Sequence, residues 1–97
     1  MSYVFDNILF SGHALRRMFQ RGVTKDRVIK AIKHGEVIAE YPEDTPYPSK
    51  LILGFVNKSP LHVVFAEDKE TNTGIVVTAY VPDASLWGED YKSRRGL

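Results

Sequence analysis

The sequence contains no cysteine among its 97 residues, so disulfide bonds, thiolate zinc sites and cysteine nucleophiles are excluded. Its apolar runs are only a few residues long, well short of the about 20 that a membrane-spanning helix needs. The opening stretch, MSYVFDNILF, has no basic leader before an apolar segment and predicts no signal peptide. These absences favour a cytoplasmic protein.

Several signatures of catalytic and cofactor chemistry are also missing. There is no glycine-rich phosphate loop and no nucleophile elbow. The three histidines, His13, His34 and His62, are far apart in the sequence, and no His or carboxylate cluster has metal-ligand spacing. We therefore expect no metal and no cofactor, so that any catalysis has to come from ordinary side chains.

The length allows one domain with one modest core. We expect residues 1–97 to form a single domain, with a core over 8–83 and a partly flexible C-terminal extension over 84–97. Formal net charge is +1, but residues 11–34 hold seven of the thirteen Lys and Arg with one acid. This basic third predicts a surface that faces a polyanion. The alternative is an ordinary solvated helical face.

Two short helices are predicted in this basic third. Ser11 and Thr24 are typical N-caps, since a hydroxyl can accept a hydrogen bond from an unpaired amide at a helix start. Gly22 and Gly35 mark the two ends. Helical spacing of apolar residues predicts one buried stripe on each helix, made of Ala14, Leu15, Met18 and Phe19, then Val28, Ile29 and Ile32. The short joint predicts a tight helical hairpin.

Four strands are predicted after Gly35, in EVIAEY, KLILGFV, LHVVFAE and GIVVTAYV. The proline-rich stretch PEDTPYPS must be a loop, because proline cannot donate to a sheet ladder. We predict an α+β fold in which the N-terminal helical hairpin packs on one face of a four-stranded antiparallel sheet. Residues 8–10 could add a further strand. The second face of the sheet should be more polar and open for binding.

A basic stripe runs along the first predicted helix. His13, Arg17 and Arg21 are spaced by four residues and share a face, with Arg16 beside them. Guanidinium groups are fork-shaped charged donors that suit a phosphate. Alternatively, His13 bonds a backbone carbonyl and Arg17 pairs with an acid such as Glu40.

The last two predicted strands carry a second group of polar residues. If they pair near Glu67 and Ile75, His62 lies close to Tyr80, and Thr78 falls on the same face. These three would form a small polar island on an apolar sheet. A hydrogen-bonded core histidine is the alternative for His62.

The sequence resembles the bacterial domain of unknown function 4258 family. The resemblance runs from about residue 11 to residue 83 and depends on three elements: the S-x-H-A-x-x-R-M-x-x-R run of Ser11–Arg21, the strand with His62, and TAY at residues 78–80. It implies a fold similar to the metal-independent toxin ribonucleases of the RelE, barnase, colicin and EndoU group. The family's polar positions correspond here to His13, Arg17, Arg21, His62, Thr78 and Tyr80.

The resemblance implies an endoribonuclease that cleaves RNA by attack of the 2′-hydroxyl. His13 and His62 would be the base and the acid, in either order, since histidine titrates near neutral pH. Arg17 and Arg21 would hold the phosphate, and Tyr80 and Thr78 would support them. Tyr41 or Tyr47 could stack on a base. The implied partners are RNA, including RNA on the ribosome, and a cognate antitoxin. The alternatives are a non-catalytic RNA- or ribosome-binding module and a small protein-interaction domain.

Overall fold

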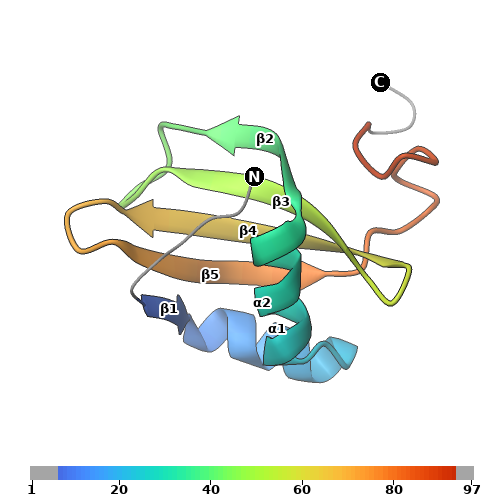
Figure 1. The fold of residues 1–97 in the computed structure, drawn as a ribbon, viewed down its shortest axis with the longest axis horizontal. Helices are drawn as coiled ribbons and strands as arrows, with labels where there is room; N and C mark the ends of the chain where they lie inside the picture. The colour runs from blue at the N-terminus through green and yellow to red at the C-terminus, as the bar shows by residue number, and fades with distance from the viewer. Residues whose placement is uncertain (1–6, 94–97) are drawn as a thin grey trace.

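The computed structural model describes residues 7–93. In that range the chain forms two helices and five strands (Figure 1). In chain order they are β1 (Asn7–Phe10), α1 (Gly12–Arg21), α2 (Lys25–His34), β2 (Glu36–Tyr41), β3 (Ser49–Val56), β4 (Ser59–Asp68) and β5 (Thr73–Tyr80). The predicted α+β class is right, and so are the positions of both helices and of the four later strands.

The sheet itself differs from the predicted one. It has five strands in the order β1-β5-β4-β3-β2, within the described part of the chain. β1 pairs in parallel with β5, from Asn7↔Thr73 to Phe10↔Val76, whereas the other neighbours are antiparallel. The prediction of a four-stranded, wholly antiparallel sheet is therefore wrong. The four residues of β1 are too few to show a clear period of two, so the sequence pattern hardly indicates this strand.

The helices begin and end where their capping residues predict. Ser11 Oγ accepts a hydrogen bond from the Ala14 amide at 3.0 Å. Thr24 Oγ1 does the same for the Arg27 amide at 3.2 Å. Gly22 ends α1 with φ of 69°, a left-handed conformation that favours glycine because it has no Cβ.

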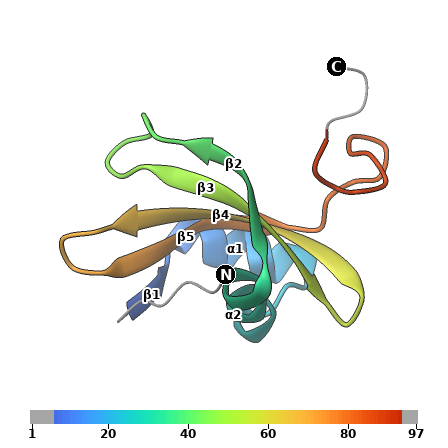
Figure 2. The same ribbon diagram turned by 45° about the horizontal axis from the view of Figure 1, so that its top comes forward.

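The two helices do not form the predicted hairpin. α1 packs along β5, while α2 packs across β3 and β4. The two helices run in different directions on one side of the sheet (Figure 2). α2 lies very close to β3 because Gly54 faces it: a Cβ at Gly54 would lie 2.6 Å from the Ala31 Cα atom. Gly54 is therefore a packing position, and the register between β3 and β4 runs through it without a shift.

The core lies between the helices and this face of the sheet. α1 contributes Ala14 and Met18, which are buried, whereas Leu15 is 38% exposed and Phe19 is 89% exposed. The prediction that Leu15 and Phe19 belong to the buried stripe of α1 was thus wrong. Small residues face the sheet because α1 lies close against β5, where Ser11 also donates to the Val77 carbonyl at 3.3 Å.

The β4–β5 register matches the prediction at the end of the hairpin that carries His62 and Tyr80. His62 pairs with Tyr80, and Val64 pairs with Thr78. Between Val64 and Phe65 the register shifts by one residue, so that Phe65 pairs with Val76. This bulge turns Val76 and Ala79 both into the core, although a strict alternation would put them on opposite faces.

The face of the sheet turned away from the helices is partly covered. The loop between β2 and β3 lies at one end, and residues 83–93 lie at the other end, beyond β5 (Figure 1). The sequence predicted this face to be more polar, but its middle is lined by apolar residues such as Val64, Ile75 and Val77. No helix within residues 7–93 is long and apolar enough to cross a membrane.

Candidate phosphate site on the open sheet face

Arg21 reaches from the end of α1 to the C-terminal half of β5. Its Nη1 atom donates to the Ala79 carbonyl at 3.0 Å and lies 3.4 Å from Thr78 Oγ1. Its guanidinium carbon lies 5.9 Å from the centre of the Tyr80 ring. β1 pairs only with Thr73–Val76, so this part of β5 has no neighbouring strand on that side. The arginine therefore wraps around a sheet edge, which fixes its orientation.

Arg21 keeps donors for a ligand. A guanidinium has five N–H groups, and both hydrogen bonds of Arg21 to residues 7–93 come from Nη1. The side chain is also exposed. An oriented, exposed guanidinium whose Nη2 and Nε atoms make no hydrogen bond to residues 7–93 can form a two-pronged contact with a phosphate.

Tyr80 and His62 continue the site across the sheet. The His62 Nδ1 atom lies 3.4 Å from the Tyr80 hydroxyl, and the two rings meet edge to face with centroids 5.3 Å apart. The structure therefore brings together Arg21, Thr78, Tyr80 and His62, four of the residues that the sequence singled out. They come from α1, β5 and β4.

His62 is fully buried, and both of its ring nitrogens have a neighbour. Nε2 lies 2.7 Å from the Tyr91 carbonyl oxygen, which can only accept, so Nε2 carries the proton. Nδ1 is then the acceptor in a neutral ring and faces the Tyr80 hydroxyl. Burial lowers the pKa of His62 below its ordinary value of 6.5, while the bond to Tyr91 raises it to a lesser extent. His62 is thus held neutral at pH 7.

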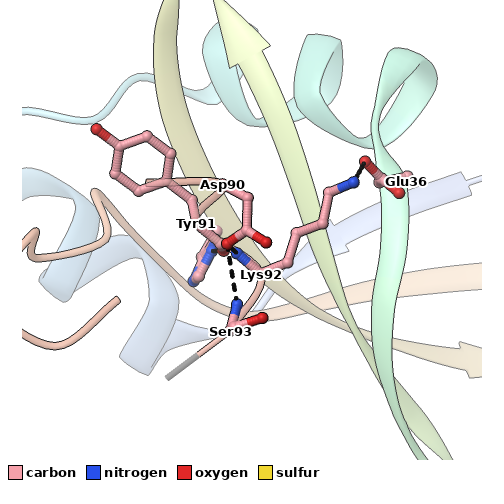
Figure 3. A network of polar contacts seen from close by, with 6 residues as sticks. Glu36, Asp90, Tyr91, Lys92 and Ser93 are labelled. Carbon is pink, nitrogen blue, oxygen red and sulfur yellow. Dashed lines mark hydrogen bonds and ion pairs between the residues drawn. The ribbon is translucent and has the colours of Figure 1, made fainter. Parts of the chain in front are cut away.

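A segment that follows β5 covers His62, and we call residues 83–93 the C-terminal strap. The Trp87 ring meets the His62 ring edge to face with centroids 4.4 Å apart. Figure 3 shows the end of the strap, where Lys92 pairs with Glu36 at 2.9 Å. Asp90 Oδ1 accepts from the backbone amides of Lys92 and Ser93. The strap therefore shields His62 from solvent in this state.

His13, Arg16 and Arg17 lie on the exposed surface of α1. None of these three side chains has an ion pair or hydrogen bond with the residues in 7–93, so neither the carbonyl partner for His13 nor the Glu40 partner for Arg17 is present. His13 and Arg17 lie along the same stripe as Arg21. His13 is at the far end of α1, however, and does not contact His62.

A hollow of about 240 Å³ lies on the same sheet face, beside this cluster. Tyr47 is one of its walls, whereas Tyr41 is not among its lining residues and is 40% exposed at the end of β2. Of the two tyrosines proposed to stack on a base, only Tyr47 is placed at the site.

The structure also holds no group of three His, Asp or Glu side chains in residues 7–93 that could bind a metal ion.

Sequence reasoning missed the strap and part of the hollow. Trp87 is the only tryptophan of the chain, which was a usable signal for a buried contact. Tyr91 acts through its backbone carbonyl, for which no sequence signal exists. Asp44 and Ser49 meet across the proline-rich loop at 2.5 Å, and only the fold shows that this pair borders the site.

The fold and the site define a small α+β domain whose helices cover one sheet face and whose basic helix edge borders the other. The sequence matches the family described as domain of unknown function (DUF4258) over residues 10–81, which is about three quarters of the chain. The chain belongs to this family. Comparison with curated proteins and with solved structures finds no match.

Proposed function

We propose that this protein is a metal-independent endoribonuclease of the toxin-like kind, which acts on RNA in the cytoplasm. The observation that carries the proposal is the meeting of Arg21, Thr78, Tyr80 and His62 on the sheet face opposite the helices. These residues come from three elements and combine an oriented cation with groups that can accept or donate a proton. A phosphodiester is the substrate class that uses both.

The phosphate would lie against Arg21. In cleavage by the 2′-hydroxyl, the attacking oxygen loses a proton, forms a bond to phosphorus, and displaces the 5′-oxygen, which gains a proton. The products are a 2′,3′-cyclic phosphate and a 5′-hydroxyl. Negative charge grows on the phosphate oxygens during this step, and a guanidinium already fixed by Ala79 needs little reorganisation to stabilise it.

The proton transfers are assigned to Tyr80 and His13. Tyr80 is half-buried and has neutral His62 behind its hydroxyl, so His62 can accept the hydroxyl proton at Nδ1 and return it. In this state His62 is a positioning residue because the strap separates it from substrate. His13 is exposed at the start of α1 and would serve the opposite transfer, with Arg17 between it and Arg21 as a second phosphate contact.

A non-catalytic RNA-binding module is the second candidate, and one observation favours it. Both ring nitrogens of His62 are engaged, and Trp87 covers the ring. A histidine held this way can be purely structural, leaving the basic edge of α1 to bind RNA without cleaving it. For the toxin-like endoribonuclease we propose two partners: a cognate antitoxin that neutralises the protein in the producing cell, and RNA on the ribosome as a substrate.

RNA cleavage in the presence of EDTA tests the proposal. The full chain is compared with Tyr80→Phe, His62→Gln, His13→Ala and Arg21→Gln, and products are identified by mass spectrometry. We expect a cyclic phosphate product, with each variant slower by about 100-fold or more, the usual size of an acid–base or charge contribution. His34→Ala is the matched control, because His34 is an exposed histidine at the end of α2.

Two results separate the candidates. Intact RNA after prolonged incubation, with binding that weakens steeply as salt rises, would contradict the enzyme and support the binding module. Cleavage that survives Tyr80→Phe and Arg21→Gln would contradict the assigned site even if the protein is a nuclease.

A further inference from the structure

The hollow beside the candidate phosphate site has a floor and two kinds of wall. Its floor is apolar and consists of side chains from β4 and β5, namely Val64, Ala66, Ile75 and Val77. The walls come from the loop between β2 and β3, with Tyr47 and the polar residues Asp44 and Thr45, and from Ser49 at the start of β3. Its volume, about 240 Å³, is below the range of about 300–1,000 Å³ that drug-sized ligands occupy. It has room for a single flat ring system.

The polar edge of the hollow can accept hydrogen bonds. Asp44 Oδ2 accepts from Ser49 Oγ at 2.5 Å, which fixes the carboxylate at the rim. No other side-chain hydrogen bond reaches this carboxylate from residues 7–93, so its second oxygen can accept from a ligand. A flat ligand on the aliphatic floor beside Tyr47, with an amino N–H group toward Asp44, would match this lining.

The hollow lies directly beside the phosphate position. Val64 is part of its floor and pairs with Thr78, and Thr78 Oγ1 lies 3.4 Å from Arg21 Nη1. Val77, the other floor residue at this end, precedes Thr78 in β5, and one residue spans about 3.3 Å of strand. Thr78 is therefore next to the floor of the hollow and also contacts Arg21, so a base in the hollow and a phosphate on Arg21 would lie on adjacent positions of the sheet.

We propose that this hollow is a nucleobase subsite that prefers bases with an exocyclic amino group: adenine, guanine and cytosine. This subsite would recognise one base of the RNA substrate. Its biological role rests on the proposed function. Uracil presents a carbonyl oxygen where cytosine presents its amino group, and a carboxylate oxygen repels that carbonyl. The result would be cleavage or binding that disfavours uridine at one position.

Mononucleotide binding to the full chain tests the subsite without requiring cleavage. Adenosine, guanosine, cytidine and uridine 3′-monophosphates are titrated separately, with inorganic phosphate as the probe that has no base, and amide chemical shifts are followed by NMR. We expect the three amino-bearing nucleotides to bind about tenfold more tightly than the uridine nucleotide, the effect of one hydrogen bond to a charged group. Shift changes should include Val64, Ile75 and Val77.

Three variants and one control define the site. Asp44→Asn should reduce the tenfold preference to less than about threefold, because a neutral amide repels the uracil carbonyl less. Tyr47→Ala should weaken all four nucleotides, and Val77→Trp should do so by filling the hollow even if Tyr47→Ala disturbs the loop. Tyr41→Ala is the control, since Tyr41 lies outside the hollow. Thermal melting checks that each variant is folded.

The outcomes for the subsite and for the nuclease are distinct. Equal binding of all four nucleotides and inorganic phosphate, or affinities that Val77→Trp leaves unchanged, would overturn the subsite. A protein that shows the base preference but cleaves no RNA would support the subsite and overturn the catalytic proposal. Cleavage without any base preference would overturn the subsite alone.

Discussion

His62 shows how a single residue can join the core to the site. Its ring is buried under Trp87, and its two nitrogens contact Tyr91 and Tyr80. The same contacts that fix the ring also keep it neutral, because burial disfavours the charged form. The stability of the domain and the state of the Tyr80 hydroxyl are therefore linked through one side chain.

The lowered pKa of His62 predicts a stability that depends on pH. In the unfolded chain the ring titrates near 6.5, and in the folded protein it titrates below that value. The unfolded state binds more protons between these two values, so the free energy of unfolding is largest above pH 6.5 and falls as pH decreases. Urea unfolding between pH 7.5 and 5 measures this.

A matched pair of histidine variants checks the assignment to His62. His62→Gln should flatten the decline in the free energy of unfolding toward low pH, whereas His34→Gln should leave it unchanged because His34 is exposed. A decline of equal steepness in the His62→Gln variant would show that other groups cause it.

At the scale of elements, two contacts hold the site in place. α2 packs on β3 through Gly54 and Ala31, and the strap packs on β4 through Trp87 and His62. The first contact is part of the core and leaves no spare volume. The second is made by hydrogen-bonded turns at residues 83–87 and 88–91 and lies outside the main core cluster, so we expect it to open at the lower free-energy cost.

The close approach of α2 to β3 predicts a large cost for Gly54→Ala. The added methyl group would lie 2.6 Å from the Ala31 Cα and 2.7 Å from its Cβ, so the helix has to move away. We expect a loss of about 1–3 kcal/mol in the free energy of unfolding, as for other overpacked cores. Gly12→Ala is the control, because nothing lies within 4 Å of its added methyl group.

Because Trp87 covers the His62 ring, we expect Trp87 to control how far solvent reaches His62. Trp87→Ala should raise the pKa of His62 toward its ordinary value, since burial is the main cause of the lowering. NMR titration of the His62 ring protons measures the change. Leu86→Ala, at an exposed neighbouring position, should leave the pKa of His62 as it is. A pKa unaffected by Trp87→Ala would mean that the sheet alone buries the ring.

At the scale of the whole molecule, the net charge is small, but basic side chains are concentrated on one helix. The net charge is only +1, yet α1 carries His13, Arg16, Arg17 and Arg21 on its exposed surface, and Arg21 reaches the edge of the open sheet face. Under the proposed function, such an arrangement would attract RNA to this helix while limiting binding elsewhere on the surface. Affinity for RNA should therefore depend on few contacts.

This arrangement predicts a shallow dependence of RNA affinity on salt. Arg17→Ala should weaken binding and reduce the slope of log affinity against log salt by about 1, as expected for one lost phosphate contact. Lys69→Ala, an exposed lysine in the loop between β4 and β5, should change neither value. Fluorescence anisotropy with a labelled oligonucleotide measures both, and equal effects of the two variants would contradict a site on α1.

The extent to which the sequence predicted this molecule differs between its parts. Caps, strand positions and the His62–Tyr80 pairing follow from local chemistry and from alternation along strands, and they were predicted correctly. A strand at residues 8–10 was suggested, but its parallel pairing with β5 was not predicted because that pairing depends on residues far away in the sequence. Leu15 and Phe19 were placed in the core because helical spacing alone does not tell which of two adjacent stripes faces the sheet.

The site was predicted only where its residues carry functional side chains. Arg21, Thr78, Tyr80 and His62 were found by their spacing on helix and strand. The Tyr91 carbonyl and the rim formed by Asp44 and Ser49 exist only after the chain has folded. The roles in catalysis and base recognition remain predictions for the experiments described above.

The parallel pairing of β1 with β5 has a consequence for synthesis on the ribosome. β1 leaves the exit tunnel well before its partner, which spans Thr73–Val76 and lies far away in the sequence. The sheet cannot be closed at this edge before then, and contacts so distant in sequence slow folding. Until β5 arrives, the edge of β1 and the apolar side of α1 stay unpaired, so this edge of the sheet is completed only after β5 has emerged.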